Sequence, residues 1–90
     1  MYNVYTTKRY DKDFKRIVSN LKLIYEIEAV ITLLAANDAP LPKKYKDHRL
    51  DYSAFRECHI RPDWLLVYKK TEKNLILLLV GTGSHSHIFN

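Results

Sequence analysis

The first 36 residues show the apolar spacing of two amphipathic helices. Over Lys8–Ser19, apolar side chains recur at i, i+4, i+7 and i+8, which predicts one helix with a single apolar face: Tyr10, Phe14, Ile17 and Val18. A second helix is predicted over Leu21–Ala36, where a longer apolar stripe runs along the chain: Leu23, Ile24, Ile27, Val30, Ile31 and Leu34. Asn20 stands between them as an N-cap. Because the link is short, we expect the two helices to form an antiparallel pair.

The second half of the chain changes to the alternating pattern of strands. Residues 37–42 hold Asp38 and two prolines and form a loop, and residues 43–51 are polar and basic without a clear period. Strands are predicted over three segments that are separated by turns at 61–63 and 71–74: Phe55–Ile60, Trp64–Lys70 and Leu75–Val80. A further short strand, Tyr2–Thr6, precedes the helices, and residues 81–90 form a polar tail. Strand, two helices and a three-stranded meander indicate an α+β fold, with helices on one face of an antiparallel sheet and the other face open to a ligand.

Composition narrows the class of protein. The chain has 90 residues, which fits one domain over 1–90, and 47% of them are apolar, enough for one core. The one cysteine, Cys58, excludes an internal disulfide framework and suits a reducing compartment. We see no signal peptide, and the longest apolar run, Leu75–Val80, is too short for a bilayer, so we expect a cytoplasmic protein without a membrane partner. The net charge of +5 suits a nucleic acid or an acidic protein, and charge alone does not separate these from an ordinary soluble surface.

The residue types of the C-terminal half suit acid–base cleavage of RNA. All four histidines lie there, with an aspartate, arginines and a tryptophan nearby: His48, His59, His85, His87, Asp63, Arg56, Arg61 and Trp64. Cleavage without a metal needs a base for the 2′-OH, an acid for the leaving 5′-oxygen, and cations for the phosphorane. Histidine suits both proton transfers, arginine the phosphate, and an aromatic ring a stacked base. Each residue also has a plain structural role available, so these types alone indicate only an RNA-binding or RNA-cleaving domain.

Ordered sequence blocks carry a family likeness over residues 41–89. The blocks are Leu41-Pro42, Tyr45-Lys46-Asp47-His48, Arg56-Glu57-Cys58-His59-Ile60, Pro62-Asp63-Trp64-Leu65-Leu66-Val67-Tyr68 and Thr82-Gly83-Ser84-His85-Ser86 with Phe89. Together they resemble the YafQ branch of the RelE-like toxins, the toxin halves of bacterial type II toxin–antitoxin pairs. Residues 1–40 match only as a strand and two amphipathic helices.

The resemblance implies a ribosome-dependent endonuclease that acts on mRNA without a cofactor or metal. It also implies a cognate antitoxin as partner, with operator DNA bound only through the antitoxin complex. By motif position the catalytic residues would be His48, His59, Asp63 and His85, with His85 as the general acid. Trp64 and Phe89 would flank the site, and the basic residues expected to bind RNA are Arg56, Arg61, Lys43, Lys44 and Lys46.

The sequence departs from this family pattern in three places. Gly81 stands where relatives usually carry arginine, so Arg56 or Arg61 would have to stand in for that cation. The stretch from Asp51 to Ala54 is shorter than usual, and His87 is an extra histidine.

Two other functions stay open on the sequence alone. A metal-dependent hydrolase could use His85-x-His87 on an extended segment, completed by His59 or Asp63. A toxin-fold protein could bind antitoxin, DNA or ribosome without cutting.

Overall fold

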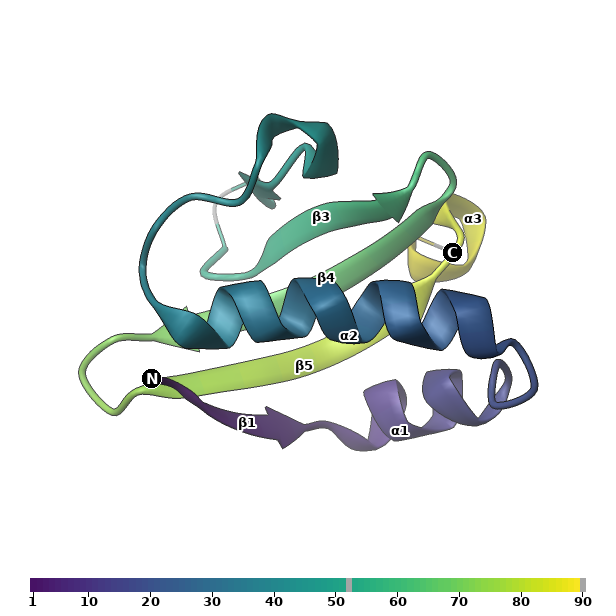
Figure 1. The fold of residues 1–90 in the computed structure, drawn as a ribbon, viewed down its shortest axis with the longest axis horizontal. Coiled ribbons are helices and arrows are strands. Elements are labelled where there is room, and N and C mark those ends of the chain that lie inside the picture. Colours follow the sequence, from purple (N-terminus) through teal and green to yellow (C-terminus); the bar gives the residue numbers. More distant parts are fainter. Residues whose placement is uncertain (52, 90) are drawn as a thin grey trace.

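A single five-stranded sheet forms the centre of the computed structural model, which describes residues 1–51 and 53–89 (Figure 1). Its strands lie in the order β1-β5-β4-β3-β2. Their bounds are β1 Asn3–Thr6, β2 His48–Arg49, β3 Arg56–Arg61, β4 Trp64–Thr71 and β5 Ile76–Gly83. β1 runs parallel to β5, and the other neighbours are antiparallel. The predicted α+β class and the meander are confirmed, and the N-terminal strand joins the same sheet at the β5 edge.

The two predicted helices are present and run in opposite directions (Figure 1). α1 spans Lys8–Lys15 and α2 spans Leu21–Ala36, the second with the predicted bounds. The side chain of Asn20 accepts a hydrogen bond from the amide of Leu23 at 3.2 Å, so the predicted N-cap is confirmed. The expected end of the first helix at Ser19 was wrong. After Lys15 the amides of Arg16 and Ile17 bond carbonyls three residues back, which tightens the chain into a turn.

The hydrophobic core lies between both helices and one face of the sheet, as the alternating pattern predicted. α2 contributes Ile27 and Val30, which pack with sheet residues such as Leu66 and Leu77. Cys58 is fully buried in this core, and burial raises the pKa of its thiol to about 12. The opposite face of the sheet, called the open face below, carries a smaller apolar cluster formed by Leu65, Val67 and Ile88.

Three elements of the structure were not predicted from the sequence. A 3₁₀ turn, η1, spans Lys43–Tyr45, and β2 has only two residues, so neither gives a period that sequence reasoning can detect. β5 continues three residues beyond Val80, and residues 85–89 form a helix, α3 (His85–Phe89), where an irregular tail was expected. The stretch from Asp51 to Ala54, which is shorter than usual, includes Tyr52, and the predicted tail includes Asn90; these two residues lie outside the described part of the chain.

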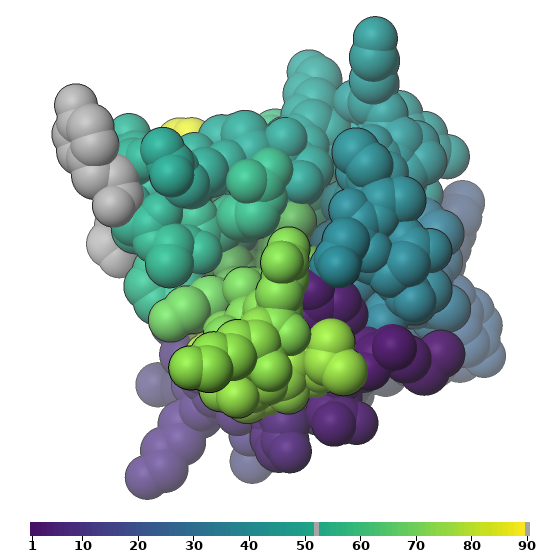
Figure 2. Space-filling model, turned by 90° about the vertical axis from the view of Figure 1, so that its left-hand side faces the viewer, coloured from purple at the N-terminus to yellow at the C-terminus, as the bar shows by residue number. Residues whose placement is uncertain are grey.

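The N-terminal residues pack at the end of the molecule that lies opposite α3 (Figure 1). Figure 2 shows them (purple) beside the β4–β5 turn (light green) and the segment that follows α2 (blue-green). Tyr2 donates a hydrogen bond to Asp38, and the Nζ of Lys70 donates to the carbonyl of Asn37 at 2.8 Å while it lies over the Tyr2 ring. Within the described residues, no helix has the length and apolar character needed to span a membrane.

Candidate active site

The open face carries a row of polar side chains across β2 and β3. His48 pairs with Glu57 across β2 and β3, and Glu57 pairs in turn with Val67 of β4. His59 lies two residues along β3 from Glu57, opposite Leu65. Side chains that pair across strands, or stand two apart along one, point to the same face of a sheet. His48, Glu57 and His59 therefore share the face opposite α1 and α2.

The backbone orients both histidine rings in the same way. The Nδ1 of His48 donates to the carbonyl of Lys46 at 2.9 Å, and the Nδ1 of His59 donates to the carbonyl of Pro62 at 3.2 Å. Lys46 has a left-handed backbone, with φ of 48°, and ends η1. Because Nδ1 is committed to a carbonyl in each ring, Nε2 is the nitrogen that remains for proton exchange.

A buried carboxylate lies between these two nitrogens. Glu57 Oε1 is 3.5 Å from the Nε2 of His48 and 3.8 Å from the Nε2 of His59, and the Glu57 side chain is only 5% exposed. Its other oxygen, Oε2, is buried without a hydrogen-bond partner in the described chain. A carboxylate so placed stabilises an imidazolium formed at either ring. Sequence reasoning missed Glu57, although its position two residues before His59 on a predicted strand put both on one face.

His85 and Phe89, two further predicted site residues, lie on α3, which follows the end of β5. The two rings lie one helical turn apart with centroids 4.7 Å from each other, and both side chains are exposed. α3 begins two residues after Gly83, and Gly83 pairs with Leu65 in the row that contains His59. His59 and Gly83 are thus two strand spacings apart, about 10 Å. α3 therefore begins two strands across the sheet from His59.

Asp63 and Trp64, at the β3–β4 turn, lie in different surroundings: Asp63 is exposed to solvent and Trp64 packs on the helix side of the sheet. Asp63 is exposed in the turn directly after Pro62, which holds the His59 ring. Trp64 is half buried against the core on the helix side, and its indole Nε1 donates to the hydroxyl of Thr82 at 2.9 Å. Thr82 donates in turn to the carbonyl of Leu65 at 2.7 Å. Trp64 therefore ties β4 to the last residues of β5, just before α3.

Both arginines that could replace the cation missing at Gly81 are already paired. Arg56 donates twice to Asp47 Oδ2, at 2.9 and 3.3 Å, and Tyr68 donates to the other oxygen of the same carboxylate. Arg56 pairs across the strands with the core residue Tyr68, so it faces the helices and lies away from Glu57. The pKa of Arg56 is raised, chiefly by its bond to Asp47. Arg61 donates from Nε to Glu26 of α2 at 2.7 Å.

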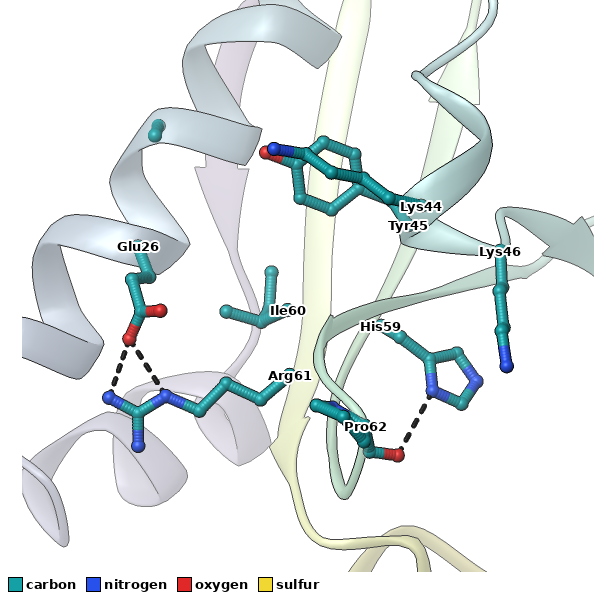
Figure 3. Close-up of a pocket in the computed structure, with 9 residues that line it drawn as sticks. Glu26, Lys44, Tyr45, Lys46, His59, Ile60, Arg61 and Pro62 are labelled. Atoms are coloured by element: carbon teal, nitrogen blue, oxygen red, sulfur yellow. Dashed lines mark hydrogen bonds and ion pairs between the residues drawn. The ribbon is translucent and has the colours of Figure 1, made fainter.

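Basic residues border a pocket that reaches His59. The pocket has a volume of about 370 Å³ and lies between α2, η1 and the end of β3 (Figure 3). Lys44, Lys46 and Arg61 line it, and Ile60 forms part of its floor. Three of the residues predicted to bind RNA thus line the same pocket as a predicted catalytic histidine. Lys43 is exposed on η1 and does not line this pocket.

The structure removes the geometry that the metal-dependent alternative required. Because residues 85–89 are helical, His85 and His87 point to different sides, and the expectation of an extended segment was wrong. The Nε2 of His87 bonds Asp13 of α1 at 2.7 Å. No group of three or more histidine, cysteine, aspartate or glutamate side chains in the described ranges is placed to hold a metal ion.

Comparison with known proteins gives one consistent result. The model of the family described as "Bacterial toxin of type II toxin-antitoxin system, YafQ" matches residues 2–90. The mRNA interferase toxin YafQ of Escherichia coli K12 is 39% identical over 83 residues, which cover 90% of this chain and 88% of that protein. The crystal structure of the E. coli DinJ–YafQ complex contains a chain with a TM-score of 0.87 and 33% identity, with full coverage of both chains. A metal-bound toxin from Helicobacter pylori is similar at a TM-score of 0.84 and 46% identity, covering 99% of this chain and all of that one.

Proposed function

Because this chain belongs to the YafQ family of bacterial type II toxins, we propose that it is an endoribonuclease that cleaves mRNA on the ribosome and is neutralised by a cognate antitoxin. The observation that supports this best is the pair of Nε2 atoms of His48 and His59 on either side of the Glu57 carboxylate. The name of the E. coli relatives, mRNA interferase, gives the substrate class, and the DinJ complex gives the kind of partner.

The proposed reaction is internal attack by the 2′-hydroxyl on the adjacent phosphate. His59 takes the 2′-OH proton on Nε2, because its ring is less exposed than that of His48 and borders the basic pocket. The new imidazolium is stabilised by the Glu57 carboxylate. The 2′-oxygen forms a bond to phosphorus, and the bond to the 5′-oxygen breaks. The products are a 2′,3′-cyclic phosphate and a 5′-hydroxyl.

His85 is the proposed general acid, and it donates its proton to the leaving 5′-oxygen. It is exposed on α3, which follows β5, two strands across the sheet from His59 on β3. This separation suits an acid and a base that act on opposite sides of one phosphate. Phe89 packs against the His85 ring and limits its rotation. Lys44 and Lys46 extend the site as contacts for backbone phosphates, whose charge attracts them without regard to sequence.

Cleavage of a programmed ribosome complex in single turnover tests this mechanism. We expect cleavage to persist in excess EDTA, once the magnesium that holds the ribosome together is controlled for, and to leave a 2′,3′-cyclic phosphate. Because a similar toxin from H. pylori is metal-bound, the measurement in EDTA is a necessary test of the proposed metal-independent mechanism. A substrate with a 2′-deoxy residue at the cut site should resist, and its cleavage at the normal rate would rule the mechanism out.

Gly81 supports a second candidate, a toxin that binds its partners without cutting, because the motif arginine is missing there. Growth arrest after expression of the lone chain separates the two functions. A cutting toxin arrests growth, a His85→Ala variant at equal protein level does not, and co-expressed antitoxin restores growth. Equal arrest by the wild type and His85→Ala would favour the second candidate.

A further inference from the structure

α3 carries the proposed general acid but is too short to hold its own position. Five residues make barely more than one helical turn, and isolated helices of this length do not persist in water. One side of α3 presents His85 and Phe89 to solvent, and Ile88 is buried against Leu65 and Val67. The remaining side of α3 must therefore be fixed by other contacts if His85 is to have one orientation.

Asp13 of α1 supplies such a contact through His87. The carboxylate of Asp13 is almost fully buried, with 4% exposure. Its Oδ1 accepts from the Nε2 of His87 at 2.7 Å, and its Oδ2 accepts from the amide of Thr82 at 3.1 Å. One aspartate therefore ties α1, β5 and α3 together. Arg9 adds a second link from α1, because its Nη2 donates to the carbonyl of Ile88 at 3.1 Å.

The two glycines of β5 make room for this arrangement. A Cβ at Gly83 would lie 2.6 Å from Cδ2 of the His87 ring, closer than real side chains approach. A Cβ at Gly81 would lie 3.2 Å from Arg9 Nε and 3.3 Å from Asp13 Oδ2. The missing side chain at Gly81 thus coincides with close packing of Arg9 and Asp13 on the strand.

The partners of His87 leave its ring no free nitrogen. Nδ1 faces the Nη1 of Arg16 at 3.4 Å, and a guanidinium can only donate. Nδ1 is therefore the acceptor, and Nε2 carries the proton that bonds Asp13. His48 and His59 have the reverse arrangement, in which Nδ1 donates to a backbone carbonyl and Nε2 faces the Glu57 carboxylate at 3.5–3.8 Å. Both nitrogens of the His87 ring are thus used in contacts that fix the ring against α1.

We propose that His87 is a positioning residue, which through Asp13 fixes α3 and so orients His85 toward the phosphate. The proposal rests on the proposed function, and it assigns a role to the histidine that the family motif does not require. It also predicts that His87 affects the chemical step only when His85 is present.

Single-turnover cleavage across a range of toxin concentrations tests the proposal. His87→Ala should lower the maximal rate roughly 10- to 100-fold, the cost of a slightly misplaced catalytic group, with the half-saturating concentration unchanged. His87→Gln keeps a donor for Asp13 and should restore most of the rate. Ser86→Ala changes an exposed residue of the same helix and should cleave like the wild type. Circular dichroism confirms that each variant is folded.

Two further measurements separate positioning from an independent role. The double variant His85→Ala/His87→Ala should cleave no more slowly than His85→Ala alone. Amide exchange of Ile88, whose NH bonds the Ser84 carbonyl, should accelerate in His87→Ala and stay slow in His87→Gln. Wild-type rates in His87→Ala, or additive losses in the double variant, would overturn this proposal alone. A wild type that does not cleave would overturn the proposed function and this proposal with it.

Discussion

Replacing Glu57 with glutamine should slow cleavage without a matching loss of stability. The substitution keeps the shape of the side chain and removes the negative charge that lies 3.5 Å from the Nε2 of His48 and 3.8 Å from that of His59. In the proposed reaction that charge matters in the transition state, when one ring has accepted a proton. In the ground state the carboxylate is buried with one oxygen unpartnered, which is unfavourable for the folded protein.

The structure sets the size of the effect. Two unit charges about 4 Å apart interact by about 4 kcal/mol at the effective dielectric constant typical of sites near a protein surface. The rings of His59 and His48 are 23% and 52% exposed, so solvent screens much of this energy. A residual of about 1–2 kcal/mol follows, which corresponds to a rate lower by roughly 5- to 30-fold. Because a neutral amide is less costly to bury than a carboxylate, the free energy of unfolding should fall by no more than about 1 kcal/mol.

Glu28→Gln is the matched control, since it removes the same charge from an exposed position on α2. Single-turnover cleavage on programmed ribosomes gives the rates, and urea denaturation gives the free energies of unfolding. Equal rates for the two glutamine variants would refute the role given to Glu57. A rate loss in Glu57→Gln that merely follows a large loss of stability would refute it as well.

Three further outcomes are expected. His85→Ala should lower the single-turnover rate by roughly 10²–10⁴-fold, the worth of a positioned acid, and therefore by more than His87→Ala; the reverse order would show that the acid is misassigned. Asp47→Ala leaves the buried Tyr68 and the half-exposed Arg56 without their acceptor. The free energy of unfolding measured in urea should fall by about 2–3 kcal/mol, and an unchanged value would show that this cluster does not stabilise the fold. The Cys58 thiol, whose pKa burial raises from 9.0 to about 12, should resist iodoacetamide at pH 8. Its folded pKa exceeds the unfolded one, so its stabilising contribution is complete below pH 9 and is lost as pH rises toward 12, a decline that Cys58→Ala should reduce in urea titrations.

The long periodic segments could be predicted from the sequence because burial itself produces their pattern. α2 has the predicted bounds, since its apolar stripe spans four turns and Asn20 caps its start. β2 and α3 could not be predicted in the same way. A two-residue strand has no period, and α3 is held by a contact with Asp13, 74 residues away from His87.

The candidate site, like the fold, could be predicted only in part from the sequence. Residue chemistry and the family blocks singled out His48, His59 and His85, and the structure places all three on or beside the open face. The spacing of Glu57 and His59 on one predicted strand puts both on one face, but only the pairing of Glu57 with His48 of β2 shows that its carboxylate lies between two imidazoles. Arg56 was expected beside the phosphate, but strand register turns it to the helix side, where Asp47 holds it.

The pairing of β1 with β5 affects when this toxin can fold during its synthesis. The hydroxyl of Thr7, just after β1, donates to the carbonyl of Val80, 73 positions later. The first strand to be synthesised therefore pairs with the last one, β5. A nascent chain that stops before Ile76 lacks the strand that joins β1 to β4 and lacks the whole of α3. Long-range pairing of this kind delays folding until synthesis is almost complete. A chain truncated before Ile76 therefore cannot form the side of the candidate site that α3 carries.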